Sequence, residues 1–361
     1  MADCCLLRTD RDDRTRDDVL RPRDPGARSG YRGGCALTRL AIDCDPGNGV
    51  PGANIDDGLA LALAVASPHV DLELVTTVAG NVPAAVGGGI AHRLFQQWDA
   101  QVPIVVGANR PLVADPGPWR RVLDRVGMSE EHRALWAGIP RPKPAGEPSE
   151  GAPEDAGLAA ADALGRLVTC NPGQIVVVGI GPLTNIALAV ETYPRFARDV
   201  AGIVVMGGAF AVAGRPIDTN FGYDPQAAQT VIASGAPLTV VPLDTTVTTM
   251  FTAADLERLR RIGSAMSSSL MQTVEPWLRY SAQTRGIRGF WLHDLLTVAM
   301  LIEPSIVTTS PARLTVSLDS EPHGVVRRET GGTGNPVTLV ESVDNAGLLE
   351  VFFEALTPPR A

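Results

Sequence analysis

The chain has 361 residues, a length that fits one large α/β domain or two ordinary ones. Hydrophobic residues make up 45% of it, which is enough for a substantial core. The formal net charge of -9 argues against nucleic acid as a partner, because phosphate binding favours a basic face. Small nucleosides stay compatible with this charge because they carry no phosphate.

The five cysteines form no CxxC pair and have no metal-ligand spacing, so we expect reduced thiols. The N-terminus lacks the apolar run of a signal peptide. The longest uncharged stretch, residues 167–190, is interrupted by Asn-Pro-Gly-Gln and by Gly-Pro, so it does not qualify as a membrane span. We therefore expect a cytoplasmic protein with no membrane partner.

Residues 1–34 are rich in Arg, Asp and Gly and bury too little apolar surface to offset their ordering entropy. We expect a disordered extension there and a single domain over residues 35–361. Two insertions are expected in this domain, at about 111–155, where the chain is rich in Pro and Gly, and at 266–291, which is expected to be helical. Such insertions often overhang the site at the carboxyl ends of strands.

From residue 37 onward, β-branched runs alternate with Ala/Leu-rich stretches. Strands are expected at 37–43, 72–80, 103–107, 174–181, 202–208 and 238–244, and helices at 56–67, 157–170 and 224–234. This alternation indicates a three-layer α/β fold, a mainly parallel sheet with helices on both faces. Antiparallel strands near 313–318 and 337–341 and a last helix over 345–356 complete the expected domain.

The most informative segment is LAIDCDPGNGVPGANIDDGLALALA, at residues 40–64. Asp43 and Asp45 end a strand on one face, and Asp56 and Asp57 open a helix. Four carboxylates at one junction repel one another unless a cation lies among them. Oxygen ligands without nearby Cys or paired His favour Ca²⁺ or Mg²⁺ over zinc. The segment alone leaves one alternative open, helix capping by Asp56 with turn-forming Asp and Gly.

Phosphate loops of the G-x-x-G-K and GxGxxG types are missing, and Gly87–Gly89 and Gly207–Gly208 are interpreted as turn glycines. Three further segments draw attention: VVVGIGPLTNIALA, RPIDTNFGYDPQAA and WLHDLLTVAMLIEP. Each has an ordinary structural explanation on its own. These are a strand-to-helix turn, an Asx turn at Asp218 and Asn220, and a helix cap beside a core histidine at His293–Asp294.

Together these segments resemble the inosine–uridine-preferring nucleoside hydrolase family. The matching order is DCDPG…DDGLALALA, TTVAGN, VGIGPLTNIALA, VVMGG, TNFGYDPQAA and LHDLLTVA, and it covers the chain from residue 37 to the C-terminus. The resemblance implies Ca²⁺-dependent hydrolysis of the N-glycosidic bond of ribonucleosides, which releases ribose and a free purine or pyrimidine base. It also implies a homodimer or homotetramer.

The resemblance carries over residue by residue. It implies that the carboxylates of Asp45, Asp57 and Asp294 and the backbone carbonyl of Ile180 bind Ca²⁺. Asp45 is also the general base on the attacking water, and His293 assists departure of the base, in keeping with the ordinary pKa range of histidine. The residues that contact the sugar are Asp56, Asn81, Met206, Asp218 and Asn220.

The chain departs from the family in three places. The stretch NGVPGAN, residues 48–54, separates DPG from Asp56–Asp57, either as a rim over the ribose pocket or as a surface bulge. Asp218 stands where the family has glutamate. A region with Trp119, His132 and Trp136 replaces the Gly/His-rich segment that contacts the base. Two alternatives follow: a hydrolase of another N-riboside (nicotinamide or modified base), and a non-catalytic ribose- or nucleoside-binding protein.

Overall fold

The computed structural model describes residues 37–145, 156–319, 323–330 and 332–358. The extension expected over residues 1–34 lies outside this part of the chain, as do residues 146–155 of the first insertion. The unit discussed below is Leu37–Ala361.

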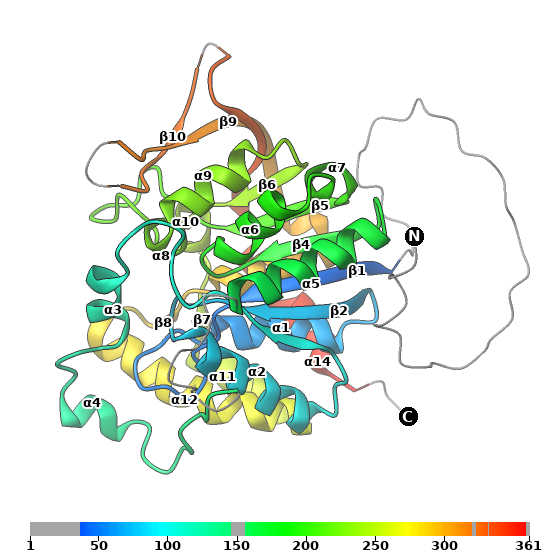
Figure 1. The fold of residues 1–361 in the computed structure, drawn as a ribbon. Coiled ribbons are helices and arrows are strands. Elements are labelled where there is room, and N and C mark those ends of the chain that lie inside the picture. The colour runs from blue at the N-terminus through cyan, green and yellow to red at the C-terminus, as the bar shows by residue number, and fades with distance from the viewer. Residues whose placement is uncertain (1–36, 146–155, 320–322, 331, 359–361) are drawn as a thin grey trace, which may run out of the picture. The chain divides into compact units, whose positions relative to one another are not determined.

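Within the described residues, nine strands form one sheet in the order β10-β9-β11-β6-β5-β4-β1-β2-β3 (Figure 1). The strands are β1 (Thr38–Cys44), β2 (Val70–Thr77), β3 (Ile104–Val106), β4 (Ile175–Gly179), β5 (Gly202–Met206), β6 (Leu238–Val241), β9 (Val307–Val316), β10 (Val326–Arg328) and β11 (Asn335–Val343). From β11 through to β3 each adjacent pair of strands is parallel, whereas β9 is antiparallel to both β11 and β10. The expected antiparallel pair is therefore present, but β11 also pairs in parallel with β6.

Side-chain alternation along the central strands divides the core between the two faces of the sheet. In β1, Leu40 and Ile42 belong to one apolar cluster, and Ala41 belongs to the other. The same alternation recurs in β4 and β5. Both faces are thus buried, which explains why these strands read as continuous apolar runs.

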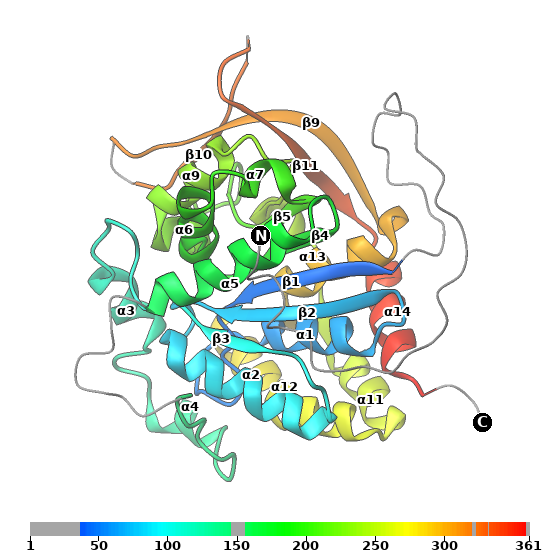
Figure 2. The same ribbon diagram turned by 45° about the vertical axis from the view of Figure 1, so that its right-hand side comes forward.

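Helices cover both faces and make three layers, as the sequence predicts (Figures 1 and 2). One side carries α1 (Asp56–Ala66), α2 (Ala84–Trp98), α11 (Ala253–Ile262), α12 (Ala265–Arg285), α13 (His293–Ile302) and α14 (Asn345–Leu356). The other side carries α5 (Ala156–Cys170), α6 (Thr184–Thr192), α7 (Phe196–Asp199) and α9 (Pro225–Ala233). Within the described part of the chain, no helix is both long and apolar enough to cross a bilayer.

Cys44, the last residue of β1, is a free thiol buried in the core, as expected for a reduced cysteine.

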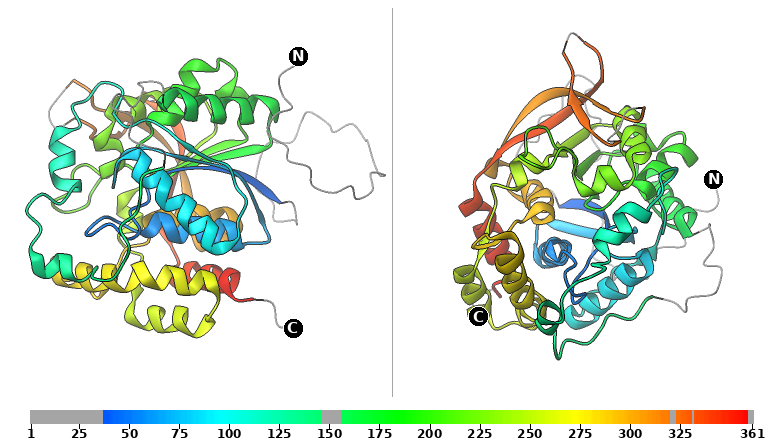
Figure 3. Two further views of the ribbon diagram at one scale, coloured as in Figure 1. Left: turned by 60° about the horizontal axis from the view of Figure 1, so that its bottom comes forward. Right: turned by 90° about the vertical axis from the view of Figure 1, so that its left-hand side faces the viewer.

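The first insertion contains α3 (Gly117–Leu123) and α4 (Glu130–Ala134) (Figure 3), and its residues 143–145 lie against α2. The backbone N–H of Ala145 donates to the carbonyl of Ala85. A Cβ on Gly89 would lie 1.8 Å from the carbonyl oxygen of Lys143. The interpretation of Gly87–Gly89 as turn glycines is therefore wrong. They lie within α2, where the lack of a side chain lets another backbone approach.

Asp224 fixes the near end of the same insertion. As the N-cap of α9, its Oδ1 accepts from the backbone N–H of Ala227. Its Oδ2 accepts from the N–H of Leu112, 2.9 Å away, and from the hydroxyl of Thr184, 2.7 Å away. One buried carboxylate therefore ties together α9, α6 and the start of the insertion.

We expect Asp224→Ala to lower the free energy of unfolding by about 3 kcal/mol, because it leaves buried donors without acceptors. Asp344→Ala is the matched control, since Asp344 also caps a helix but is exposed. That change should cost about 1 kcal/mol. Urea unfolding measures both, and equal losses would show that the contacts of Asp224 outside its cap add nothing.

Candidate active site

Strand β1 ends at Cys44, and the two aspartates on either side of this residue have different partners. Asp43 accepts from the hydroxyl of Thr76 at 2.6 Å and from the side-chain amide of Asn185 at 2.8 Å. Asp45 accepts from Asn81, through its backbone N–H at 2.5 Å and its side-chain amide at 3.2 Å. Asp45 lies outside the strand, which ends at Cys44, so the expectation that strand alternation turns both carboxylates to one face is wrong.

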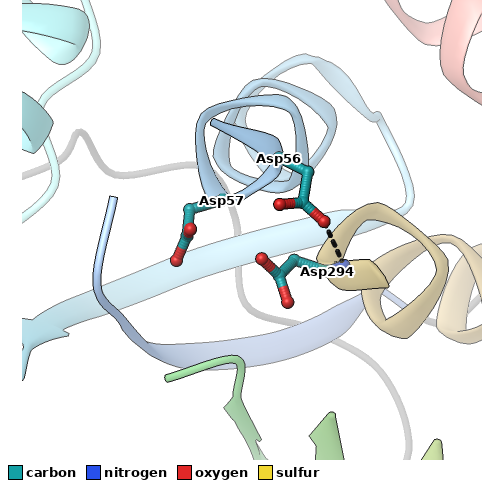
Figure 4. Close-up of side chains that lie close together, drawn as sticks. All are labelled: Asp56, Asp57 and Asp294. Carbon is teal, nitrogen blue, oxygen red and sulfur yellow. Dashed lines mark hydrogen bonds between the residues drawn. The ribbon is translucent and has the colours of Figure 1, made fainter. Parts of the chain in front are cut away.

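Three carboxylates gather where the N-terminal ends of α1 and α13 meet (Figure 4). Asp56, Asp57 and Asp294 each offer an oxygen, and these oxygens lie within 4.8 Å of one another. The backbone N–H of Asp294 donates to Asp56 Oδ2 at 2.9 Å, which joins the two helices. The positive ends of both helix dipoles point at this cluster and stabilise negative charge there.

Burial makes this cluster electrostatically demanding. Burial, followed by the charge of Asp56, raises the pKa of Asp57 to about 7. The pKa of Asp294 is also raised well above its usual range, by burial and then by Asp56 and Asp57. Among the described residues, no Lys or Arg forms an ion pair with these aspartates, and Asp56 Oδ1 is buried without a hydrogen-bond partner. An all-oxygen donor set with an unsatisfied oxygen fits a hard divalent cation.

The predicted metal ligands fall into two groups. Asp57 and Asp294 belong to the three-carboxylate cluster, together with Asp56, which the resemblance assigns to ribose. Asp45 lies beside the cluster, where its backbone N–H donates to Asp57 Oδ1 at 2.9 Å. The carbonyl of Ile180 accepts from the side chain of Asn220 and keeps a second lone pair.

A pocket adjoins the cluster and contains most of the predicted site. Seven predicted residues line it: Asn81, Ile180, Met206, Asp218, Asn220, His293 and Asp294. Asp45, Asp56 and Asp57 are buried. Asn220 donates to the carbonyls of Ile180 and Met206, both at 3.1 Å, and thereby links the ends of β4 and β5 to α8 (Thr219–Tyr223).

Asp218 is the N-cap of α8. Its two oxygens accept from the backbone N–H groups of Phe221 at 3.0 Å and Gly208 at 2.7 Å. Burial raises the pKa of its carboxyl to about 6. The capping explanation therefore accounts for the contacts seen, and contact with a ribose hydroxyl stays a prediction.

His293 lines the same pocket at the start of α13. Its Nδ1 lies 2.7 Å from the hydroxyl of Thr246. Burial, and then the charges of Arg285 and Arg215, lower the pKa of the ring to about 3. The ring is therefore neutral at neutral pH, and the expectation of an ordinary histidine pKa is wrong. A neutral imidazole still offers one N–H as a hydrogen-bond donor.

Sequence reasoning missed the arginines of the pocket. Arg125, Arg215 and Arg285 all line it. Arg215 is the first residue of RPIDTNFGYDPQAA, and Arg285 lies in the second insertion. Both segments therefore stood out in the sequence, but nothing in it marked these two arginines as pocket residues.

The aromatic residues of the first insertion are not in the pocket lining. Trp119 donates to the carbonyl of Gly222, and His132 and Trp136 pack edge-on against Tyr280. Their contacts are structural ones among the insertion, α8 and α12.

The inserted stretch 48–54 is held inside the molecule. Asn48 is buried, and its side chain donates to the carbonyl of Ile55 and the hydroxyl of Thr273, both at 3.2 Å. Arg93 donates to the carbonyl of Asn48, and Arg125 donates to that of Gly52. At its end, Asn54 lines the pocket. These contacts disagree with a surface bulge and agree with a rim.

A sequence profile of the inosine-uridine preferring nucleoside hydrolase family matches residues 40–350. A pyrimidine-specific ribonucleoside hydrolase, RihA of Salmonella gallinarum, is 29% identical over 326 residues, which cover 88% of this chain and 97% of the relative.

Two solved structures are similar in fold. A plant nucleoside hydrolase, PpNRh1, is 28% identical in sequence and has a TM-score of 0.72. The match covers 89% of this chain and 99% of that one. A purine-preferring ribonucleoside hydrolase from Gardnerella vaginalis has a TM-score of 0.71 at 24% identity, with 89% of this chain and 98% of that one covered.

We expect Asp57→Asn to stabilise the metal-free protein, because it removes one of several buried, mutually repelling charges. The folded-state pKa of about 7 exceeds the ordinary value of 3.8, so wild-type stability should fall as pH rises between these values. Thermal unfolding in chelator at pH 8 should show a rise of about 2 °C or more, and added Ca²⁺ should raise the variant's Tm less than the wild type's. Exposed Asp71→Asn is the control. A lower Tm in chelator together with an unchanged response to Ca²⁺ would contradict this expectation.

Proposed function

Since the chain belongs to the inosine-uridine preferring nucleoside hydrolase family, we propose that it is a Ca²⁺-dependent enzyme that uses water to cleave ribonucleosides into ribose and a free purine or pyrimidine base. Members of this family and its structural neighbours are ribonucleoside hydrolases. The observation that carries the proposal is the buried cluster of Asp56, Asp57 and Asp294 beside a pocket lined by Asn81, Asn220 and His293.

The donor set supports Ca²⁺ as the ion. The ion would be held by Asp45, Asp57, Asp294 and the carbonyl of Ile180. Asp56 belongs to the same three-carboxylate cluster and could also take part. When bound, the ion would supply a Lewis acid for water and a grip on the ribose hydroxyls. The cation would also offset the mutual repulsion that, together with burial, raises the pKa values of these carboxylates.

The protein's own groups then perform three tasks. Asp45 takes the proton of the attacking water, a role that suits its pKa, which burial and the charge of Asp57 raise well above the usual range. Asp56, Asn81 and Asn220 orient the ribose hydroxyls, and the surrounding carboxylates stabilise positive charge that builds on the ribose as the bond to the base breaks. Met206 gives the sugar an apolar contact, and Asp218 lies near the 5′-hydroxyl.

His293 assists the departing base. Because its ring is neutral, it acts through a hydrogen bond from its N–H, which strengthens as negative charge builds on the base. The contact between Nδ1 and Thr246 orients the ring.

The substrate's base and the assembly remain predictions. One relative bears the name pyrimidine-specific and one structural neighbour purine-preferring, so both base classes are in the proposal. The homodimer or homotetramer also stays a prediction.

A reducing-sugar assay with inosine and uridine should detect ribose release that chelator abolishes and Ca²⁺ restores. Asp45→Ala and Asp294→Ala should each lower kcat/KM by more than about a thousandfold while the circular dichroism spectrum is retained. Asp71→Asn, at an exposed position near the start of β2, should leave kcat/KM unchanged. Normal activity and full metal occupancy in both active-site variants would rule out the assignment. Tight binding of ribosides without ribose release would favour the non-catalytic alternative.

His293→Ala should lower kcat for inosine and uridine by about a hundredfold or more, yet largely spare p-nitrophenyl riboside, whose leaving group needs no assistance. His293→Gln, which keeps an N–H donor, should recover part of the loss. Equal losses on all three substrates, with no recovery by glutamine, would instead mean that His293 only supports the fold.

A further inference from the structure

One side of the pocket is cationic, and the proposed function assigns neither the metal nor the ribose to this side. Arg125, Arg215 and Arg285 line it, on three segments that are distant in the sequence. The guanidinium group of Arg125 already has a partner within the protein, because its Nε donates a hydrogen bond to the carbonyl of Gly52 at 2.8 Å. Among the residues that the structure describes, the guanidinium groups of Arg215 and Arg285 have no such bond.

Arg215 and Arg285 are held by one aromatic ring. Their guanidinium carbons lie 5.2 Å and 5.4 Å from the centroid of Trp291. Arg285 also lies 4.9 Å from the ring centroid of Trp277. Within the described part of the chain, neither guanidinium makes a hydrogen bond or an ion pair with another residue. Stacking thus fixes both groups in position while their N–H donors stay available.

Bringing these cations together is unfavourable unless negative charge lies near them. Burial, followed by the charges of Arg215 and Arg125, lowers the pKa of Arg285 to about 10, and the charge of Asp56 only partly opposes this lowering. Arg285 still stays protonated at neutral pH. Two guanidinium groups with free donors match the two oxygens of a carboxylate, and this pairing is among the stronger hydrogen-bonded contacts in proteins.

The anion belongs on the base rather than on the ribose. Trp291, which holds both arginines, has its ring 5.8 Å from that of His293, the residue proposed to assist the base. The ribose end of the pocket is lined by Asp218 and Asp294, whose negative charge disfavours a phosphate on the sugar.

We propose that the preferred substrates are ribonucleosides whose base carries a carboxylate, recognised jointly by Arg215 and Arg285. The inference rests on the proposed function and leaves the reaction unchanged. The C1′–N bond breaks, the oxygen of water bonds to C1′, and the base nitrogen keeps the electron pair and ends with a proton.

The test compares substrates that differ by one charged group: uridine, 5-carboxyuridine, uridine 6-carboxylate and uridine 5′-monophosphate. The full chain with Ca²⁺ should cleave at least one carboxylated nucleoside with a kcat/KM about tenfold or more above that of uridine. Arg215→Gln combined with Arg285→Gln should reduce this ratio about tenfold, and 0.5 M salt should weaken it. Arg279→Gln is the matched control, because Arg279 lies on the same helix, is exposed and pairs with Glu275. It should leave the ratio unchanged.

The outcomes separate this inference from the function it rests on. Ribose release from uridine with no gain from either carboxylate, or a gain that the double variant keeps, overturns the inference and leaves the function standing. A preference for the 5′-monophosphate alone also overturns it, because the anion would then sit on the sugar. If no riboside is cleaved, the proposed function fails. Calorimetry then decides the inference, which requires a carboxylated nucleoside to bind about tenfold tighter than uridine in the wild type but not in the double variant.

Discussion

The buried negative charge of Asp56, Asp57 and Asp294 is the constraint on which the arrangement of the site depends. The bond between Asp56 and the N–H of Asp294 joins residues 238 positions apart and brings two helix N-termini to one point. Helix dipoles and backbone donors share the negative charge at this junction, and the cluster could also hold a cation. The parallel sheet makes the meeting possible, since the carboxyl ends of its strands all reach one edge.

The pocket beside this junction has two chemically unlike walls. In the proposed binding mode, carboxylates and amides face the sugar, which is uncharged and rich in hydroxyl groups, and their close spacing suits an oxygen-seeking ion. The guanidinium groups beside Trp291 would then face the base. An environment with separated charges orients a substrate before any bond changes, because a reversed molecule would place each of its ends against the wrong charge.

The sequence revealed much of the sheet, since its buried strands are continuous apolar runs, and the local motif around Asp56 and Asp57 revealed the acidic cluster. It could not reveal properties that arise between distant segments. The low pKa of His293 comes from its burial and then from arginines in two other parts of the chain. The different partners of Asp43 and Asp45 follow from a strand that ends one residue before the expected pair is complete.

Residues 48–54 return almost to the place where they leave. A Cβ on Gly47 would lie 2.3 Å from the carbonyl oxygen of Asn54, so the two ends of the excursion touch. Residues 48–54 therefore form an Ω-loop, and the contact between its two ends holds Asp45 near Asp56 and Asp57. The entropic cost of bringing the two ends of a loop together grows only logarithmically with the length of the loop. The half-buried tip at Val50 and Pro51 can therefore change in length, and a designer who grafts a recognition segment there keeps the buried anchor at Asn48 and an intact acidic centre.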